Sequence, residues 1–413
     1  MANTAASAAD APLAGIRVTD FTWIGAGSYT TKLLADAGAD VVKIESTGRI
    51  DSLRLAAPYK DGVKGVNRSG YFADRNSGKR SLTLNMKHPR ALELVSRLIA
   101  QSDVIANNFT PGVMDRFGLG YEAVRRIRPD IIYLAMSMQG ATGPEKGYLG
   151  YGSTMAAVTG IQHLTGLPGR EPAGTGTNYP DHLPNPCHAA FAVLSALRHR
   201  RRTGQGQYID MAQTEPTVAL LGPAVMEYTV NGHDPQPAGN ASRDEAAPYG
   251  AYPCQGQDRW IAIGIHDDAQ WAALVRALDA PAWMNDPALG EAAGRRARRA
   301  CIDERLAAET RRFEAPALAA ALQAAGIPAM PVSTAADVIA DPQLAHRGHW
   351  LTLDHPEMGP SLYNAQPFRM RHAPPGVRRP APLLGQHTRE VCRELLGLAD
   401  DEIAALEADG ALS

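Results

Sequence analysis

The first part of the chain alternates strand-like and helix-like hydrophobic patterns. Apolar and polar residues alternate over 16–21, and β-branched residues fill 41–45, as both do in strands. Between them, residues 29–37 have the apolar spacing of a helix, and Gly38 occupies the position of a C-terminal cap. The glycines of residues 25–27 predict a turn from the first strand into this helix.

The same alternation continues through the first half of the chain. Further strands are predicted at 103–106, 131–136 and 208–211, and further helices at 89–100, 121–127 and 188–202. Because helices separate successive strands, the pattern indicates βαβ units. We therefore expect an α/β fold, with a parallel sheet that carries helices on its faces.

The second half has a different organisation. Residues 231–253 are rich in Gly, Pro, Asn and Asp without periodicity, which predicts a linker. A second region follows, with a strand at 260–263, alanine-rich helices and a short strand at 327–332. From residue 334 onward the pattern predicts proline-rich turns. A chain of 413 residues exceeds what one hydrophobic core usually serves, so at least two domains are expected.

Composition narrows the class of protein. Apolar residues make up 45% of the chain and charged residues 20%, which excludes a largely disordered protein. The formal net charge of −2 argues against a dedicated nucleic-acid binder, and no apolar run approaches the ~18 residues of a membrane span. Residues 1–11 lack a basic start and an apolar stretch, so we expect a frayed tail and not a signal peptide.

The four cysteines are far apart and form no CxxC motif, and the histidines form no HExxH motif. This usage is typical of a protein in a reducing cytoplasm, where disulfides are rare. We expect a cytoplasmic protein without a disulfide framework and without a zinc site.

The glycine turn is the first candidate for ligand chemistry. Gly25 and Gly27 follow a strand, and Glu45 ends the next strand, which nearly matches the dinucleotide fingerprint. Thr30 replaces the third glycine, which weakens the match. On these residues alone a nicotinamide or flavin site, another nucleotide-like ligand and a plain tight turn all remain open.

Several polar residues lie where predicted strands give way to helices, which is where open α/β sheets bind ligands. Lysine and arginine there suit phosphates, and asparagine suits a ribose or an amide. The alternative for each is solvated surface charge. These residues are Arg80, Lys87, Asn108 and Arg116.

Asp181 lies in a proline-containing loop, residues 178–182, before the long helix. An aspartate in such a loop most often forms a cap or a turn. The alternative is a nucleophile or base held at the mouth of a cleft. His182 follows directly, but adjacent residues on an extended loop usually point apart, so a direct pair of the two is the less favoured interpretation.

Several segments, taken together and in order, resemble the class III CoA-transferase family. That family includes formyl-CoA, carnitine and benzylsuccinate CoA-transferases and α-methylacyl-CoA racemase. The resemblance covers nearly the whole chain from Pro12. The segments are residues 12–18 with 20–22, 34–45, 76–84 (NSGKRSLTL), 108–118, 200–207 and 381–388.

The resemblance implies an architecture. A Rossmann-like large domain with a parallel sheet would take residues 1–230 as its N-terminal, CoA-binding part. Residues 231–333 would form a linker and a smaller α/β domain, and residues 334–413 a return linker and the C-terminal part of the large domain. Two such chains would form an interlocked homodimer.

The resemblance also implies site residues. Asp181 matches the catalytic aspartate of the family. Ser46 stands where relatives often have a phosphate-binding arginine, so one phosphate contact is either missing or supplied by Arg49 or Arg54. Lys146 is the nearest substitute for a family lysine. The full set of implied CoA contacts is Ile24, Gly25, Arg54, Leu84, Met86, Lys87, Asn108, Phe109, Thr110, Arg116, Lys146 and Tyr151.

The implied reaction moves CoA from an acyl-CoA donor to a free carboxylic acid through an aspartyl mixed anhydride and a β-aspartyl-CoA thioester. CoA is a co-substrate, and neither a metal nor NAD is needed. The alternative is a 2-methylacyl-CoA racemase or an intramolecular CoA isomerase. A racemase needs a second acid/base group where this chain has Tyr151, which is a poor base near neutral pH.

The donor and acceptor are less well indicated. The run of glycines typical of the formyl-CoA branch is absent from residues 240–252, which argues against oxalate or formate. Four polar residues near the expected mouth could hold a second carboxylate, which favours a dicarboxylic acid and succinyl-CoA as donor. They could equally be turn residues. The four are His163, Arg170, Tyr179 and His182.

Overall fold

The computed structural model describes residues 10–241, 246–373 and 375–413, which form two compact units. The first unit contains the described residues up to Gln162 together with Gly174–His233 and Gln343–Ser413. The second contains His163–Ala173 and the described residues of 234–342. Most of the predicted tail, residues 1–9, and residues 242–245 of the predicted linker lie outside the described part of the chain.

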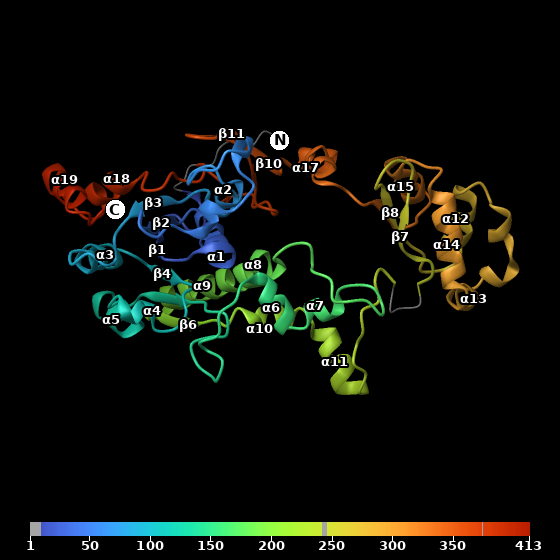
Figure 1. The fold of residues 1–413 in the computed structure, drawn as a ribbon, viewed down its shortest axis with the longest axis horizontal. Coiled ribbons are helices and arrows are strands. Elements are labelled where there is room, and N and C mark those ends of the chain that lie inside the picture. Colours follow the sequence, from blue (N-terminus) through green and yellow to red (C-terminus); the bar gives the residue numbers. More distant parts are fainter. Residues whose placement is uncertain (1–9, 242–245, 374) are drawn as a thin grey trace. The chain divides into compact units, whose positions relative to one another are not determined.

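A six-stranded parallel sheet forms the centre of the first unit (Figure 1). Its strands are β1 (Arg17–Asp20), β2 (Asp40–Glu45), β3 (Arg80–Thr83), β4 (Val104–Asn107), β5 (Ile132–Ala135) and β6 (Gln207–Asp210). Their order, β3-β2-β1-β4-β5-β6, is that of a doubly wound Rossmann-like sheet, in which ligands bind where the order reverses, between β1 and β4. The predicted α/β class with a parallel sheet is confirmed.

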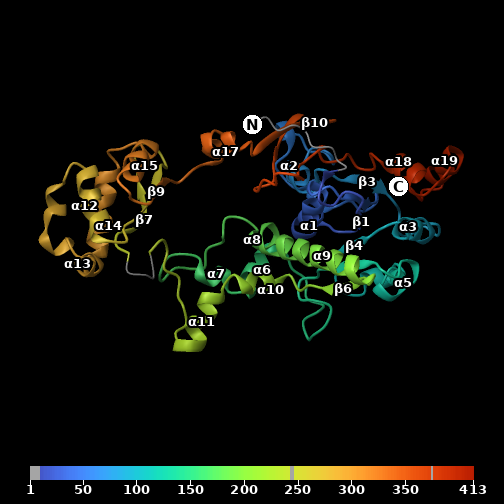
Figure 2. The ribbon, with the colours of Figure 1, turned by 180° about the vertical axis from the view of Figure 1, so that it is seen from behind.

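One face of the sheet is covered by α1 (Ile24–Asp36) and α9 (Pro184–Thr203), which pack against each other (Figure 2). Small residues on both helices, such as Ala26 and Ala189, meet Val18 and Val104 of the sheet in one buried cluster. Small side chains let a helix approach a sheet closely, so this face brings the start of α1 next to the strand ends.

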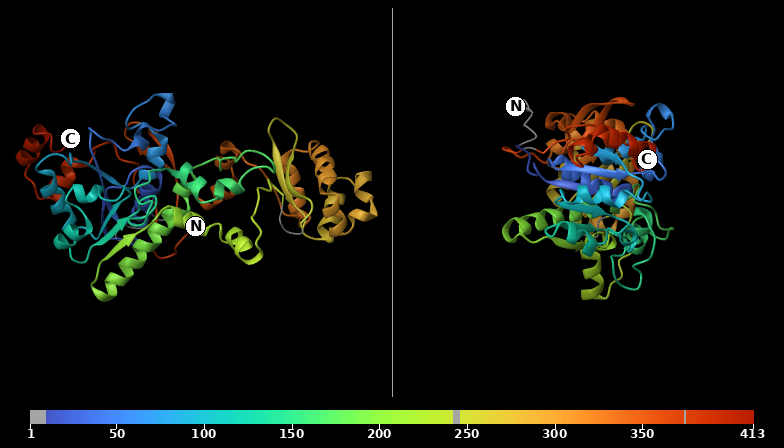
Figure 3. Two further views of the ribbon diagram at one scale, coloured as in Figure 1. Left: turned by 60° about the horizontal axis from the view of Figure 1, so that its bottom comes forward. Right: turned by 90° about the vertical axis from the view of Figure 1, so that its left-hand side faces the viewer.

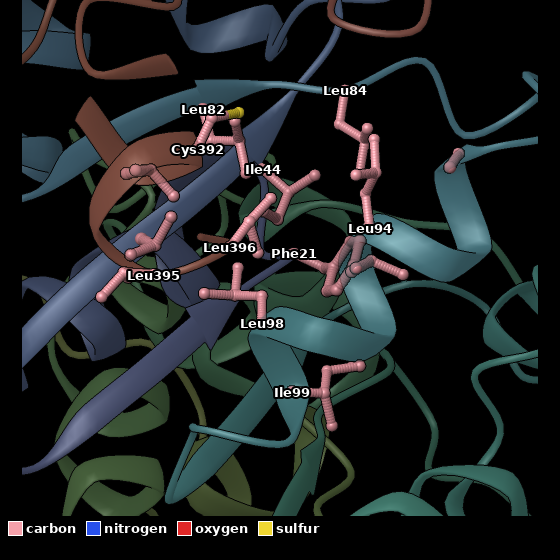
Figure 4. Packing of buried hydrophobic residues seen from close by; sticks show 14 of the residues in the cluster. Phe21, Ile44, Leu82, Leu84, Leu94, Leu98, Ile99, Cys392, Leu395 and Leu396 are labelled. Carbon is pink, nitrogen blue, oxygen red and sulfur yellow. The ribbon is translucent and has the colours of Figure 1, made fainter. Parts of the chain in front are cut away.

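The other face is covered by α3 (Ala91–Ile99), α5 (Tyr121–Ile127), α18 (Thr388–Glu394) and α19 (Asp400–Ala408). Leu94, Leu98 and Cys392 meet Ile44 and Leu82 of the sheet in a second buried cluster (Figure 4). The last two helices are far from the sheet in sequence. The C-terminal segment therefore completes the core of the first unit.

Helix α1 begins earlier than the sequence pattern predicts. It starts at Ile24, so the glycines that we expected in a turn lie in the first helical turn. The reason is close packing, because a Cβ on Gly25 would lie 2.8 Å from Asp181 Cβ and one on Gly27 would lie 2.6 Å from Thr22 Cβ. Glycine fits this crowded helix start despite its low helix propensity. At the other end, Gly38 has φ +104°, the left-handed conformation expected of a C-terminal cap.

The second unit contains a three-stranded antiparallel sheet of β7 (Tyr249–Pro253), β8 (Trp260–Gly264) and β9 (Ala329–Pro331). Helices α12 (Asp268–Ala277), α14 (Arg299–Thr310) and α15 (Ala315–Ala324) accompany this sheet in the yellow and orange part of the ribbon (Figure 3). The three helices contribute to one core with Ile261 and Ile263. The end of the predicted linker is wrong, since residues 249–253 form a strand. Gly250 and Pro253 are residue types depleted in strands, so the composition of this segment is closer to that of a linker.

The C-terminal region is also more regular than the predicted proline-rich turns. It contains the hairpin of β10 (Trp350–His355) and β11 (Gly359–Asn364).

The remaining α-helices of the described residues are distributed along the chain. They are α2 (Gly70–Asn76), α4 (Val113–Arg116), α6 (Gly152–Val158), α7 (Ile161–Leu164), α8 (Tyr179–His182), α10 (Thr214–Ala219), α11 (Gly222–Asn231), α13 (Ala292–Ala297), α16 (Ala335–Ile339) and α17 (Pro342–Arg347). Among the described residues, none of the helices has the length and apolar character needed to cross a membrane.

Candidate active site

A cavity of about 100 Å³ lies where the sheet order reverses. Segments that follow three strands line it, together with Asp181 of α8. Ile24 and Gly25 come after β1, Asn108 comes after β4, and Ser137 comes after β5. The cavity thus occupies the position at which a doubly wound sheet binds its ligand.

Asp181 is the buried carboxylate of this cavity, with only 4% of its surface exposed. Its Oδ2 accepts a hydrogen bond from the Gly152 backbone N–H at 3.2 Å. Burial raises the pKa of Asp181 to about 6, although the Gly152 N–H and the positive charge of Arg75 partly oppose this rise. At neutral pH the side chain is therefore mainly ionised but more basic than an ordinary aspartate.

Two glycines enclose the Asp181 side chain. A Cβ on Gly25 would lie 2.8 Å from Asp181 Cβ, and a Cβ on Gly152 would lie 2.6 Å from Oδ2. Neither distance is compatible with an ordinary atomic contact. Gly152 begins α6 and Gly25 lies in the first turn of α1, so two helix starts lie directly against the Asp181 side chain. The side chain is thereby fixed in one position in the cavity.

His182 does not pair with Asp181. Its Nε2 lies 2.7 Å from the Tyr71 hydroxyl, and its Nδ1 lies 3.0 Å from the Thr177 hydroxyl. Burial lowers the pKa of His182 to about 4, so the ring is neutral at neutral pH. The two neighbouring side chains have different partners, so His182 is not paired with Asp181 as a base.

More than half of the residues that we expected at the site line this one cavity. They reach it from α1, from the segments after β4 and β5 and from α8. Lys146 and Tyr151 are exposed at its rim, whereas Gly25 and Asp181 are buried. The set is Ile24, Gly25, Asn108, Thr110, Lys146, Tyr151 and Asp181.

The other expected contacts lie outside the cavity. Leu84 is buried in the core and offers only its backbone, and Met86 packs against that core. Lys87 and Arg116 are exposed, and Phe109 packs edge-on against Trp23 with 5.8 Å between the ring centres. These residues lie beyond the ends of β3 and β4.

Arg54 has no exposed surface in the structure. Its guanidinium donates two hydrogen bonds to Glu45, at 2.8 and 2.7 Å, and lies over the ring of Phe72. Arg49, by contrast, is exposed and lies over the ring of Trp23, 5.6 Å from its centre. Of the two arginines expected to compensate for Ser46, Arg49 has the accessible charge.

The residues expected to hold a second carboxylate are not gathered here. His163 and Arg170 belong to the second unit, and His182 binds Tyr71 and Thr177. Tyr179 is half-buried at the start of α8. None of the four lines the cavity around Asp181 within the described residues.

Sequence reasoning missed several residues that shape the site. Gly152 contributes a backbone N–H that its side-chain type does not reveal. Ser137, Met155 and Gln213 line the cavity, and nothing in their local sequence distinguishes them from core residues. Asp51 was also missed, although Lys43 within an apolar strand signals a buried partner, and Lys43 Nζ lies 2.9 Å from Asp51 Oδ2.

The chain is similar to proteins of known activity over almost its whole length. It is 33% identical to succinyl-CoA–D-citramalate CoA-transferase of Chloroflexus aurantiacus, over 96% of this chain and 97% of that protein. It is 31% identical to succinate–glutarate CoA-transferase of Agrobacterium fabrum, over 93% and 96% respectively.

Solved structures show the same relationship. A CaiB/BaiF family protein from Brucella suis superposes with a TM-score of 0.85 at 33% identity, over 93% of this chain and 99% of that one. The sequence model of CoA-transferase family III matches residues 13–388, which includes every residue of the cavity. The chain thus belongs to CoA-transferase family III.

Proposed function

We propose that this CoA-transferase takes CoA from succinyl-CoA and passes it to a free dicarboxylic acid through covalent intermediates on Asp181. The position of Asp181 carries the proposal, because a buried, basic carboxylate faces a cavity at the ligand-binding edge of the sheet. The relatives support the donor and the acid class, since their names join succinate or succinyl-CoA with citramalate or glutarate.

The first half-reaction transfers CoA to the enzyme. A carboxylate oxygen of Asp181 attacks the thioester carbonyl of succinyl-CoA, the C–S bond breaks, and CoA leaves as its thiolate. The thiolate then attacks the γ-carbonyl of Asp181 in the mixed anhydride, and succinate leaves with the bridging oxygen. The enzyme now holds a β-aspartyl-CoA thioester, so the energy of the thioester is retained.

The second half-reaction repeats these steps with the acceptor. Its carboxylate attacks the β-aspartyl thioester and expels the CoA thiolate, which gives a new mixed anhydride. The thiolate then attacks the acceptor's acyl carbon, and the Asp181 carboxylate is released together with the new CoA thioester. Charge and atoms balance across the cycle without a metal or an oxidant.

Two features of the site suit this chemistry. When thiolate adds to the Asp181 carbonyl, negative charge develops on the oxygen that faces Gly152, whose N–H lies 3.2 Å from Oδ2. Asp181 is also buried against Gly25 and Gly152 at the starts of two helices. This burial keeps bulk water from the mixed anhydride, which water would otherwise hydrolyse.

The rate should fall on acidification near pH 6. The nucleophile must be ionised to attack the thioester. Burial raises the pKa of Asp181 to about 6, whereas an ordinary aspartate loses its proton well below pH 6. We expect kcat/KM to be level above pH 7 and to fall about tenfold for each pH unit below about 5.5. Steady-state rates from pH 4.5 to 8 measure this, and an acid limb centred near pH 4 would contradict it.

Arg49 is proposed to contact a phosphate of CoA in place of the arginine missing at Ser46. Its guanidinium is exposed over the Trp23 ring, beside the segment that lines the cavity. Arg49→Met should raise KM for succinyl-CoA about tenfold and leave kcat nearly unchanged, because a phosphate contact binds ground state and transition state alike. Arg311→Met, at the end of α14 in the second unit, is the matched control with no expected change. An unchanged KM in the Arg49 variant would contradict the assignment.

The racemase alternative has less support at this site. The titratable side chains that line the cavity within the described residues are Lys146, Tyr148, Tyr151 and Asp181. Tyr151 is 62% exposed and does not form a buried pair with Asp181. An acid/base pair on opposite sides of an α-carbon is therefore not evident, and the single carboxylate fits nucleophilic catalysis better.

A homodimer completes the proposal. Helix α11 buries no residue in its own chain, and it exposes Val225, Met226, Tyr228 and Val230. A helix of a globular protein normally buries one apolar face, so this face needs a partner. We propose that a second copy covers it in the interlocked arrangement expected for the family.

The test of the proposed function is an exchange assay. The enzyme is incubated with succinyl-CoA and, one at a time, with glutarate, citramalate, malate, propionate and benzoate, and new CoA thioesters are separated by chromatography. Transfer to at least one dicarboxylic acid is expected. If the enzyme instead exchanges the α-hydrogen of 2-methylacyl-CoA with deuterium and transfers CoA to no acid, the proposal fails.

A further inference from the structure

The segment between β1 and α1 holds a strained residue beside Asp181. Ile24 has φ +60°, in the left-handed region where a β-branched residue is rare. Such a conformation persists only where the surrounding structure holds it. The Ile24 N–H donates to Oδ1 of Asp51 at 3.1 Å, and Ile24 lines the same cavity as Asp181.

Asp51 binds this segment as one member of a buried ion pair. Asp51 and Lys43 have no exposed surface, and Lys43 Nζ lies 2.9 Å from Asp51 Oδ2. Lys43 also donates to the carbonyl oxygen of Thr22 at 2.6 Å. The pair therefore binds the chain at two points that lead into the strained residue, the carbonyl of Thr22 and the amide of Ile24 itself.

A second buried pair supports the same segment. Asp20 Oδ1 accepts hydrogen bonds from the Thr22 N–H at 2.8 Å and from the Thr22 hydroxyl at 2.6 Å. The other oxygen of Asp20 lies 3.0 Å from Lys79 Nζ, and Lys79 donates to the carbonyl oxygen of Ser28 in α1 at 2.9 Å. The end of β1 and the N-terminal half of α1 are thus joined through charged groups.

Stability alone does not account for these pairs. Apolar side chains of similar size often replace a buried ion pair with no loss of stability. What the two pairs share is a set of hydrogen bonds to the backbone around Ile24. That backbone continues into Gly25, where a Cβ would lie only 2.8 Å from Asp181 Cβ, so a shift of this segment moves the wall that faces the nucleophile.

We propose that the Lys43–Asp51 pair is a positioning device for CoA transfer, which holds Ile24 in its left-handed conformation and so fixes the cavity wall against Asp181. The inference rests on the proposed role of Asp181. Asp51 does not touch the cavity, so it acts through the backbone and not on the reacting atoms. A displacement of about 1 Å at a reacting centre can lower a rate on the order of 100-fold.

The test compares two double variants that both lack the ion pair. Lys43→Met with Asp51→Asn keeps an oxygen that can accept from the Ile24 N–H, and Lys43→Met with Asp51→Leu removes it. We expect kcat of the leucine variant to be about tenfold or more below that of the asparagine variant, with melting temperatures close to each other. KM for succinyl-CoA should change much less than kcat, because the contacts of the CoA body are retained.

Lys32→Met with Asp36→Leu is the matched control. Lys32 and Asp36 also form a buried ion pair, near the other end of α1, and make no bond to the Ile24 segment. The control should keep wild-type kcat. The inference is overturned if the leucine and asparagine variants have equal kcat, or if kcat falls in all three double variants in step with their melting temperatures.

A rescue variant keeps the test decisive if the leucine variant folds poorly. Ile24→Gly added to it supplies a residue that adopts positive φ without steric cost. We expect kcat to recover by several-fold, and no recovery would contradict the inference. Failure of the proposed function looks different, because wild-type enzyme would then form no covalent adduct at Asp181 with succinyl-CoA.

Discussion

Asp181→Asn should abolish CoA transfer while leaving CoA binding intact. The substitution keeps the size of the side chain but removes the nucleophilic oxygen pair, so no mixed anhydride can form. Loss of a covalent nucleophile typically lowers kcat by about 10⁴-fold or more, and we expect a loss of that size here. Initial rates with succinyl-CoA measure kcat, and calorimetric titration with CoA measures binding.

The same variant should be more stable than the wild type at neutral pH. The folded-state pKa of about 6 lies above the unfolded value of 3.8, so the folded state holds its proton more tightly. Ionisation of Asp181 therefore destabilises the folded state relative to the unfolded state. This destabilisation is absent below pH 3.8 and reaches its full size above pH 6. Asparagine removes it, and the free energy of unfolding should rise by about 2–3 kcal/mol at pH 7.5 and be unchanged near pH 3.8.

Asp36→Asn is the control for the activity measurement. Asp36 is fully buried and paired with Lys32, but it lies at the other end of α1. Its loss should leave kcat near wild type. A stable Asp181→Asn protein that keeps more than a few per cent of wild-type turnover would remove Asp181 from the mechanism.

Gly152→Ala should lower kcat about 100-fold without unfolding the protein. The added Cβ would lie 2.6 Å from Asp181 Oδ2 and 2.7 Å from Asn178 Cβ, so the carboxylate must leave its place between the two glycines. The Gly152 N–H survives the substitution, and the loss therefore reports the position of Asp181. Rates and circular dichroism spectra of the purified variant measure it.

Gly70→Ala is the matched control. Gly70 begins α2 as Gly152 begins α6, and its added Cβ would meet only Pro58, at an ordinary contact distance of 3.4 Å. The control should keep wild-type kcat. Equal activity of the two variants would show that the glycine at position 152 does not restrain the nucleophile.

The α/β fold with its parallel sheet was predictable because its signals are local. The apolar periodicity of residues 94–99 and the β-branched strand at 41–45 identify elements that alternate along the chain, and such alternation implies a parallel sheet. Strand β3 was not visible as a strand. Its residues Arg80–Thr83 are largely polar, and their burial depends on partners such as Asp40 and Thr388 that are distant in sequence.

The sequence identified several residues of the candidate site, but it did not reveal how their atoms contact one another. The likeness to a family selected Asp181 and the segments around Ile24 and Asn108, which line one cavity. The pattern could not show that Gly152 reaches the carboxylate, because this contact joins backbone to side chain across 29 positions of the sequence. Nor could it show that Arg54 is already paired with Glu45.

A trapping experiment tests the central role of Asp181 most directly. The enzyme is incubated with succinyl-CoA in the absence of acceptor, quenched with hydroxylamine, digested and analysed by mass spectrometry. We predict a hydroxamate on Asp181 alone, formed only when succinyl-CoA is present and absent from the Asp181→Asn protein. An active enzyme that carries no label at position 181, or that carries it on another residue, would contradict the account.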